Sequence, residues 1–145
     1  MFEMSLIIAL GLLGGFAVGL QSPIAGAIGL RIGPTASSFI LHMSGMLLSG
    51  FLLFLRGGEK VRDWYHLPWY MLGSGIFGLI LFLSISVTLP RLGATVMITL
   101  IICGQLLAGL LIDQFGWFGV PLHPITLMRV CGAGLLLLGG FLIGR

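Results

Sequence analysis

Three polar side chains stand inside long apolar stretches of this sequence: Gln21, His42 and Gln105. An amide both donates and accepts hydrogen bonds, and an imidazole can exchange a proton near neutral pH. Where an apolar stretch crosses a lipid bilayer, a polar side chain needs a partner or a water-filled cavity, which makes it a candidate for function. We therefore take these three residues as candidate substrate-binding residues of a cavity within a membrane.

Each of the three residues also has a purely structural interpretation. Gln21 stands close to Pro23, which cannot donate to the carbonyl group of Gly19, so the amide could satisfy that carbonyl instead of lining a cavity. The amide of Gln105 could contact a polar ligand or bridge two helices. His42 could couple transport to protons or bind a ligand, but we favour a neutral imidazole that is hydrogen-bonded to a helix neighbour. The sequence leaves these alternatives open.

Other kinds of chemistry find no support in the sequence. Glu3 and Asp113 lie at the ends of apolar stretches, so no carboxylate is expected at the middle of a membrane. A cation exporter that exchanges its substrate against protons on a central carboxylate would need that group. No nucleophile with a base, metal-ligand spacing or phosphate-binding loop occurs, which gives no support to an enzyme, a metal site or a cofactor. No basic run suggests nucleic-acid binding.

The composition indicates that the three polar residues are carried by membrane helices. Of 145 residues 58% are hydrophobic and only 8% are charged, whereas about a quarter of a soluble domain is charged. A helix needs about 20 apolar residues to cross the hydrocarbon core. The sequence predicts an all-α integral membrane protein whose single transmembrane domain, residues 1–145, has five spans, at about 4–22, 35–55, 69–89, 92–112 and 124–144.

Two boundaries depend on particular residues. Pro23 should kink or end the first helix, and a short bent segment should then lead to Gly33 and Pro34. Pro124 suits the first position of the last helix. Arg129 would then lie six residues into that apolar stretch, from which its long side chain could reach the membrane surface.

Small and hydroxyl-bearing residues are expected to serve helix packing. Gly11, Gly15 and Gly19 form a stripe at spacing four on the first helix. Such stripes let helix backbones approach closely, within one chain or between two. Hydroxyl side chains flank the turn between the third and fourth helices, and we expect most of them to bond to carbonyl groups of their own helix. They are Ser84, Ser86, Thr88, Thr95 and Thr99.

Lysine and arginine are almost evenly divided between the two sides of the predicted membrane. Five spans place the termini on opposite sides; the N-terminal side then carries Arg56, Lys60, Arg62 and Arg129, and the other side carries Arg31, Arg91 and Arg145. An excess of Lys and Arg on the cytoplasmic side sets orientation. The chain could insert in one orientation, set weakly by the cluster at 56–62, or in both orientations and pair antiparallel. The near balance favours pairing, which would build a ten-helix inverted-repeat transporter.

Several motifs resemble those of a known family. They are Gly19-Leu20-Gln21 with Ile24, Gly29 and Arg31-Ile32-Gly33; Pro90-Arg91-Leu92-Gly93-Ala94; Gly104-Gln105-Leu106; the run Leu111-Ile112-Asp113-Gln114-Phe115-Gly116; and Arg129, Gly132 and Gly139. Over nearly the whole chain this pattern resembles the half-size, YdcZ-like branch of the drug/metabolite transporter superfamily. The resemblance implies a five-helix unit that works as a pair in a bacterial inner membrane, with Gln21 and Gln105 at motif positions. His42 matches no fixed motif position.

The resemblance and the polar residues together predict a secondary transporter. We expect an exporter of a small neutral or weakly polar metabolite, embedded in the lipid bilayer and working as an antiparallel homodimer. The small multidrug resistance proteins, which are more distant relatives, bind cations with a glutamate in their first helix; this chain lacks one. Two alternatives remain: a passive facilitator or channel-like pore of the same architecture, and a membrane subunit that does not transport.

Overall fold

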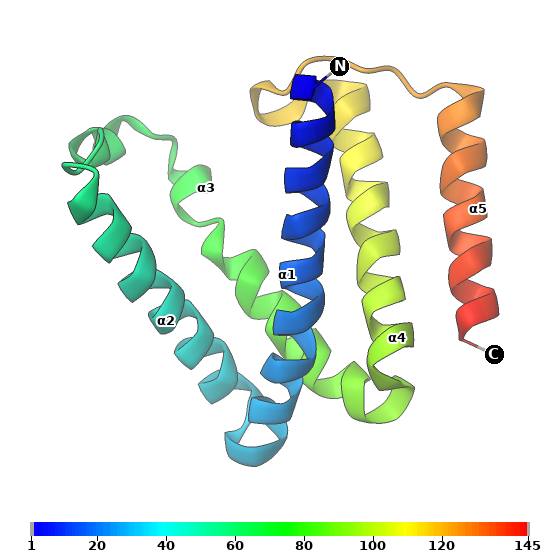
Figure 1. Cartoon of the computed structure of the whole chain (residues 1–145), viewed down its shortest axis with the longest axis horizontal. Helices are drawn as coiled ribbons and strands as arrows, with labels where there is room; N and C mark the ends of the chain where they lie inside the picture. Colours follow the sequence, from blue (N-terminus) through cyan, green and yellow to red (C-terminus); the bar gives the residue numbers. More distant parts are fainter. Residues whose placement is uncertain (1, 145) are drawn as a thin grey trace. The chain divides into compact units, whose positions relative to one another are not determined.

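The structure is a computed structural model that describes residues 2–144, with side chains from Glu3 onward. All regular elements of this part of the chain are helical (Figure 1). In chain order they are α1 (Phe2–Ile32), α2 (Pro34–Leu55), the 3-10 helix η1 (Val61–His66), α3 (Trp69–Leu72), α4 (Gly75–Phe115), the 3-10 helix η2 (Trp117–Gly119) and α5 (Leu127–Ile143). The predicted all-α fold is confirmed.

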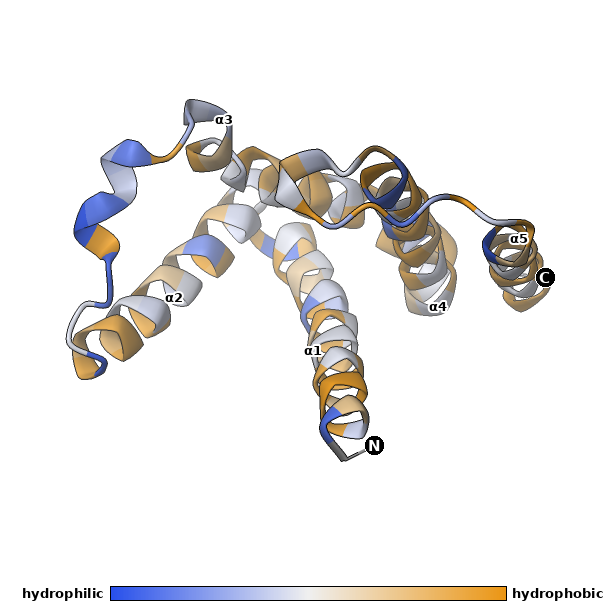
Figure 2. Ribbon diagram, turned by 90° about the horizontal axis from the view of Figure 1, so that it is seen from above, coloured by the Kyte–Doolittle hydropathy of each residue, from blue (hydrophilic) through white to orange (hydrophobic). Residues whose placement is uncertain are grey.

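The helices have the length and the surface of membrane spans. Glu3–Ile32, Pro34–Leu55 and Trp69–Phe115 are long and apolar enough to cross a bilayer, and Leu127–Ile143 is a shorter apolar helix. Large apolar side chains point outward along them, as Phe54 does at 81% exposure. Hydrophobic residues cover the helices on most sides, whereas hydrophilic ones gather in the segment between α2 and α3 (Figure 2). Lipid is a suitable solvent for such a surface, and water is not.

The 47-residue stretch Trp69–Phe115 contains two predicted spans. The hydrocarbon core is about 30 Å thick, and at about 1.5 Å per residue a helix of this length would be more than twice as long as that core requires. Its helical backbone is interrupted at Gly93, where φ is 76° and ψ is 168°. That φ is readily adopted only by glycine. The division predicted between residues 89 and 92 is therefore observed at Gly93, and α4 passes through Pro90 without ending.

The predicted end of the first helix near residue 22 is wrong. Helix α1 continues through Pro23 to Ile32, and the chain turns at Gly33, where φ is 98°. Proline removes one backbone hydrogen bond, but ending the helix there would leave several carbonyl and amide groups without partners in lipid. Continuing the helix therefore costs less than breaking it, and the turn forms where glycine permits it.

Three other helix ends differ from the predicted ones. The predicted span 69–89 is interrupted at once, because α3 ends at Leu72 and α4 begins at Gly75. The fourth span extends beyond residue 112 to Phe115. The last helix begins at Leu127, not near Pro124, because the hydroxyl of Thr126 caps it by accepting from the backbone N–H of Arg129 at 3.4 Å. The second span agrees closely, since α2 covers Pro34–Leu55.

The chain divides into two compact units, the first ending at Arg91 and the second beginning at Leu92. The core of the first unit is small and partly polar. The Ser37 hydroxyl donates to the carbonyl oxygen of Ala25 at 2.7 Å and thereby ties α2 to α1. Phe82 and Ile85 of α4 are buried, and the side chain of Ser86 occupies the space that a Cβ atom on Gly29 would need. Small residues thus permit close helix contacts here, as predicted.

In the second unit, α4 contacts α5 at small residues of α5. The methyl group of Thr99 fills the position that a side chain on Gly140 would take, and Val96 lies against Gly144. Most of the hydroxyl side chains of α4 that flank Gly93 donate to carbonyl groups of their own helix, as expected. Ser84 donates to Ile80, Ser86 to Phe82, Thr88 to Ser84 and Thr99 to Thr95, at 2.8 to 3.0 Å.

Candidate functional site

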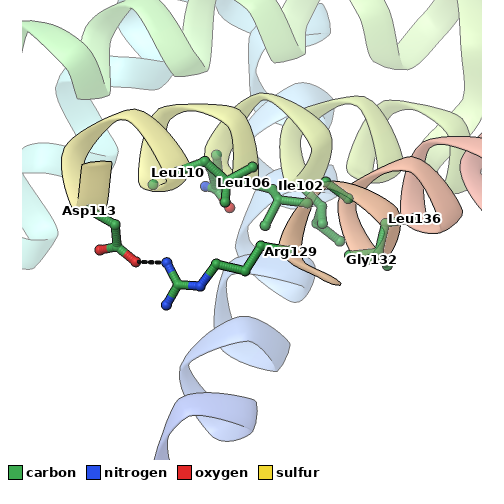
Figure 3. A pocket seen from close by; sticks show the side chains of 10 residues that line it. Ile102, Leu106, Leu110, Asp113, Arg129, Gly132 and Leu136 are labelled. Atoms are coloured by element: carbon green, nitrogen blue, oxygen red, sulfur yellow. Dashed lines mark hydrogen bonds and ion pairs between the residues drawn. The ribbon is translucent and has the colours of Figure 1, made fainter. Parts of the chain in front are cut away.

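The second unit contains an open cavity of about 680 Å³ between α4 and α5 (Figure 3). Its wall is mostly apolar, with three polar side chains: Gln105, Asp113 and Arg129. Residues four apart lie on one face of a helix, so Gln105, Gly109 and Asp113 share the face of α4 that borders the cavity. Both its size and its few polar groups on an apolar wall are typical of small-molecule sites.

An ion pair lies at one end of this cavity. The Nη1 atom of Arg129 lies 3.0 Å from Oδ2 of Asp113, and the side chains are 37% and 31% exposed, respectively. The same Nη1 donates to the carbonyl oxygen of His123 at 3.1 Å. A half-buried pair of this kind is screened less than a surface pair, and it keeps the local net charge at zero.

The loop between α4 and α5 holds the ion pair in place. The backbone N–H of His123 donates to the carbonyl oxygen of Asp113 at 2.9 Å. The backbone N–H of Ile125 donates to Oε1 of Gln114 at 2.6 Å. The end of α4 is therefore tied to the segment that leads into α5, which brings Arg129 in the first turn of α5 within reach of Asp113.

Sequence reasoning missed this pair. It placed Asp113 at a helix end and Arg129 six residues into the last span, reaching for the membrane surface. In the structure Arg129 is in the first turn of α5, because the helix begins three residues after Pro124. Two signals were available: a charge in an apolar stretch requires a partner, and Asp113 lies eight residues after Gln105, on the same helix face.

The two candidate glutamines have no hydrogen-bonding partner among the described residues. Gln105 is exposed on the cavity wall of the second unit. Gln21 is exposed on α1 in the first unit, so the alternative in which its amide satisfies the Gly19 carbonyl is not observed. The neighbouring Ser22 hydroxyl donates to the carbonyl oxygen of Val18 at 2.8 Å. Both amides are thus available to a ligand or to another chain.

His42 is hydrogen-bonded within its own helix, as we favoured. Its Nδ1 atom lies 2.7 Å from the carbonyl oxygen of Ser38 and 3.3 Å from the hydroxyl of the same residue. The ring packs edge-on against Phe82, with centroids 5.5 Å apart. His42 also borders an open cavity of about 400 Å³ together with Ser38, Gly75 and other residues of α2 and α4. Gln21, which belongs to the same unit, does not line that cavity, so the first unit does not bring Gln21 and His42 to one site.

Comparison with known proteins identifies the family. A family model described as "Putative inner membrane exporter, YdcZ" matches residues 6–142. The Inner membrane protein YdcZ of Escherichia coli (strain K12) is 31% identical over 140 residues, which cover 89% of this chain and 91% of the relative. No solved structure shows a significant match to the chain. The apolar helices and these similarities lead to one conclusion: the chain is a multi-pass membrane protein that belongs to the YdcZ family of inner membrane exporters.

Proposed function

We propose that the chain exports a small neutral or weakly polar metabolite as a secondary transporter, and that it works as an antiparallel homodimer in the bacterial inner membrane. The observation that carries this proposal is the cavity of the second unit, where the amide of Gln105 faces an apolar wall without a partner. An unpartnered amide on a membrane helix is costly unless water or a ligand reaches it. A transport pathway supplies both.

The pairing of two copies is supported by polar groups that one chain leaves uncovered. Gln21 and His42 are exposed on helices that lie in lipid. Within the first unit, nothing lies within 4 Å of a Cβ placed on Gly11, Gly15 or Gly19. A second copy could cover the amide and the imidazole, and the glycine stripe would let its helices approach closely. The nearly equal division of Lys and Arg between the two sides favours an antiparallel arrangement.

Two such copies would form a ten-helix transporter with the substrate between them. Gln21, Gln105 and His42 are our proposed substrate-binding residues. Alternating access would follow from rocking of helices around this site. No covalent chemistry is required. A transporter needs only two conformations, each of which opens the substrate site to a different side of the membrane.

The proposal can be tested with purified protein in liposomes. A metabolite library is first screened for compounds that raise the melting temperature, because a ligand stabilises the state that it binds. Counterflow of each radiolabelled hit is then measured for the wild type, Gln21→Ala and Gln105→Ala, with Leu107→Ala on α4 as the matched control. We expect both glutamine variants to lose most of the flux and the control to keep it. Normal transport by both glutamine variants would refute the site assignment.

The driving force is tested on the same vesicles by imposing and then dissipating a proton gradient. A secondary transporter coupled to protons accumulates its substrate only while the gradient persists. Flux that follows the substrate gradient alone would identify a passive facilitator.

A further inference from the structure

The proposed function assigns no role to the ion pair between Asp113 and Arg129, which lines the cavity of the second unit. Resting on the proposed transport function, we infer that this end of the cavity binds the zwitterionic headgroup of a small molecule with an apolar body, such as a free amino acid with an aliphatic side chain. Asp113 would receive the ammonium group and Arg129 the carboxylate.

Both members of the pair retain unused hydrogen-bonding capacity. The contacts of the pair use one carboxylate oxygen of Asp113 and one guanidinium nitrogen of Arg129. Within the described part of the chain, no hydrogen bond engages the second carboxylate oxygen, Nη2 or Nε. A carboxylate accepts several hydrogen bonds, and a guanidinium donates five. A headgroup can therefore bind beside the pair without breaking it.

The charge balance of the pair selects the ligand class. A ligand with one charge gains an attraction to one member of the pair and suffers a repulsion of similar size from the other. A zwitterion that lies antiparallel to the pair gains two attractions, since each of its charges meets the opposite sign. The assembly of four charges stays neutral, so no uncompensated charge is left in a half-buried place.

The rest of the cavity fits the remainder of such a molecule. Apart from the ion pair and Gln105, the wall is made of apolar residues, among them Leu106, Leu110 and Leu136 (Figure 3). Gln105 lies eight residues, or about 12 Å along the helix axis, from Asp113. An apolar body of a few carbon atoms therefore finds an apolar surface, and the amide of Gln105 remains free for a polar group at the far end or for a water molecule.

Three ligands that share one carbon skeleton test the inference on purified wild-type protein. L-leucine carries both charges, 4-methylpentanoate lacks the ammonium group, and 3-methylbutylamine lacks the carboxylate. We expect calorimetric titration to show that leucine binds about tenfold or more tightly than either analogue, because each analogue loses one charge-assisted hydrogen bond. Equal binding of the three ligands, or no binding of leucine, would overturn the inference.

Single neutralisations add a readout that a merely structural role of the pair would not change. Asp113→Asn leaves Arg129 unpaired, so the binding preference of this variant should shift from leucine toward 4-methylpentanoate. Arg129→Gln leaves the carboxylate of Asp113 unpaired, so the binding preference of this variant should shift toward 3-methylbutylamine. Glu59→Gln, which removes the exposed ion pair with Arg56, is the matched control and should keep the wild-type order. Variants with weaker but unshifted preferences would contradict the inference, and should a variant fail to fold, the three wild-type titrations still decide.

The outcome separates this inference from the proposed function. If leucine does not bind but another neutral compound is transported, the headgroup site is wrong and the transporter stands. If leucine binds with the expected order but no flux of any compound exceeds that of protein-free liposomes, the site stands and the transport function fails.

Discussion

The Nδ1 atom of His42 lies 2.7 Å from the carbonyl oxygen of Ser38, one helical turn earlier. A carbonyl oxygen only accepts hydrogen bonds, so the proton of the neutral ring resides on Nδ1. The other nitrogen, Nε2, is left as an acceptor, and it faces the backbone of α4, where a Cβ atom on Gly78 would lie only 2.6 Å away. The absence of a side chain at Gly78 thus makes room for the imidazole.

The position of the proton on the neutral ring of His42 can be measured directly. In protein labelled with ¹⁵N-histidine, the neutral ring of His42 should show a protonated Nδ1 and an unprotonated Nε2. The variant His42→Gln assigns the signal by removing it, and His66 and His123 serve as internal references. A proton found on Nε2 would show that the bond to Ser38 does not form.

Gly140 provides a test of helix packing in the second unit. A methyl group there would collide with the methyl group of Thr99, and a β-branched side chain has little freedom to turn away. Gly140→Ala should lower the free energy of unfolding by about 1–3 kcal/mol. Gly139→Ala is the control, because nothing lies within 4 Å of a Cβ at that neighbouring position. It should be neutral or slightly stabilising in the same denaturant titration, and equal losses from both variants would count against the packing described.

The ion pair of Asp113 with Arg129 and that of Arg56 with Glu59 should differ in strength. Asp113 and Arg129 are half-buried and connected to the loop, whereas Arg56 and Glu59 are 75% and 56% exposed. A double-mutant cycle with Asp113→Asn and Arg129→Gln should give a coupling energy of about 1–2 kcal/mol, between the values for exposed and buried pairs. The cycle on Arg56 and Glu59 should give less than about 1 kcal/mol. A weaker coupling for the first pair than for the second would contradict its role in holding α4 to α5.

Dual orientation can be measured with reporters at the C-terminus. A phosphatase active only outside the cytoplasm and a fluorescent protein that folds only inside it are fused separately to the chain. Because Lys and Arg are nearly balanced, we expect both fusions to be active at comparable expression. Adding two lysines beside Arg31 should shift the population toward one orientation. A single active reporter would exclude an antiparallel homodimer built from one population of chains.

Much of the fold follows from the hydropathy pattern, and the exceptions have physical reasons. The bounds of α2 agree with those predicted because Gly33–Pro34 and Arg56–Gly57 are strong start and stop signals. Pro23 misled the prediction, since a proline that ends a helix in water need not end one in lipid. The interruption at Gly73 and Ser74 was missed because neither residue alters the apolar pattern of its segment.

The candidate site was predicted only in part. Polarity in an apolar stretch singled out Gln105, and the structure places it in a cavity. Asp113 was assigned to a helix end and Arg129 to the membrane surface. Their contact was not predicted, because it depends on the loop that shifts the start of α5 to Leu127. Hydropathy carries no information about such a loop, whose geometry is set by hydrogen bonds of His123 and Ile125.

The proposed transport function is tested best by measuring flux through the reconstituted protein. Liposomes that hold purified protein and an excess of an unlabelled stabilising compound inside are diluted into the same compound in radiolabelled form. If the chain is a transporter, the label accumulates transiently above the level in protein-free liposomes, and Gln105→Ala loses that accumulation. Label that never exceeds the protein-free level, for any compound that stabilises the protein, would contradict the transport function.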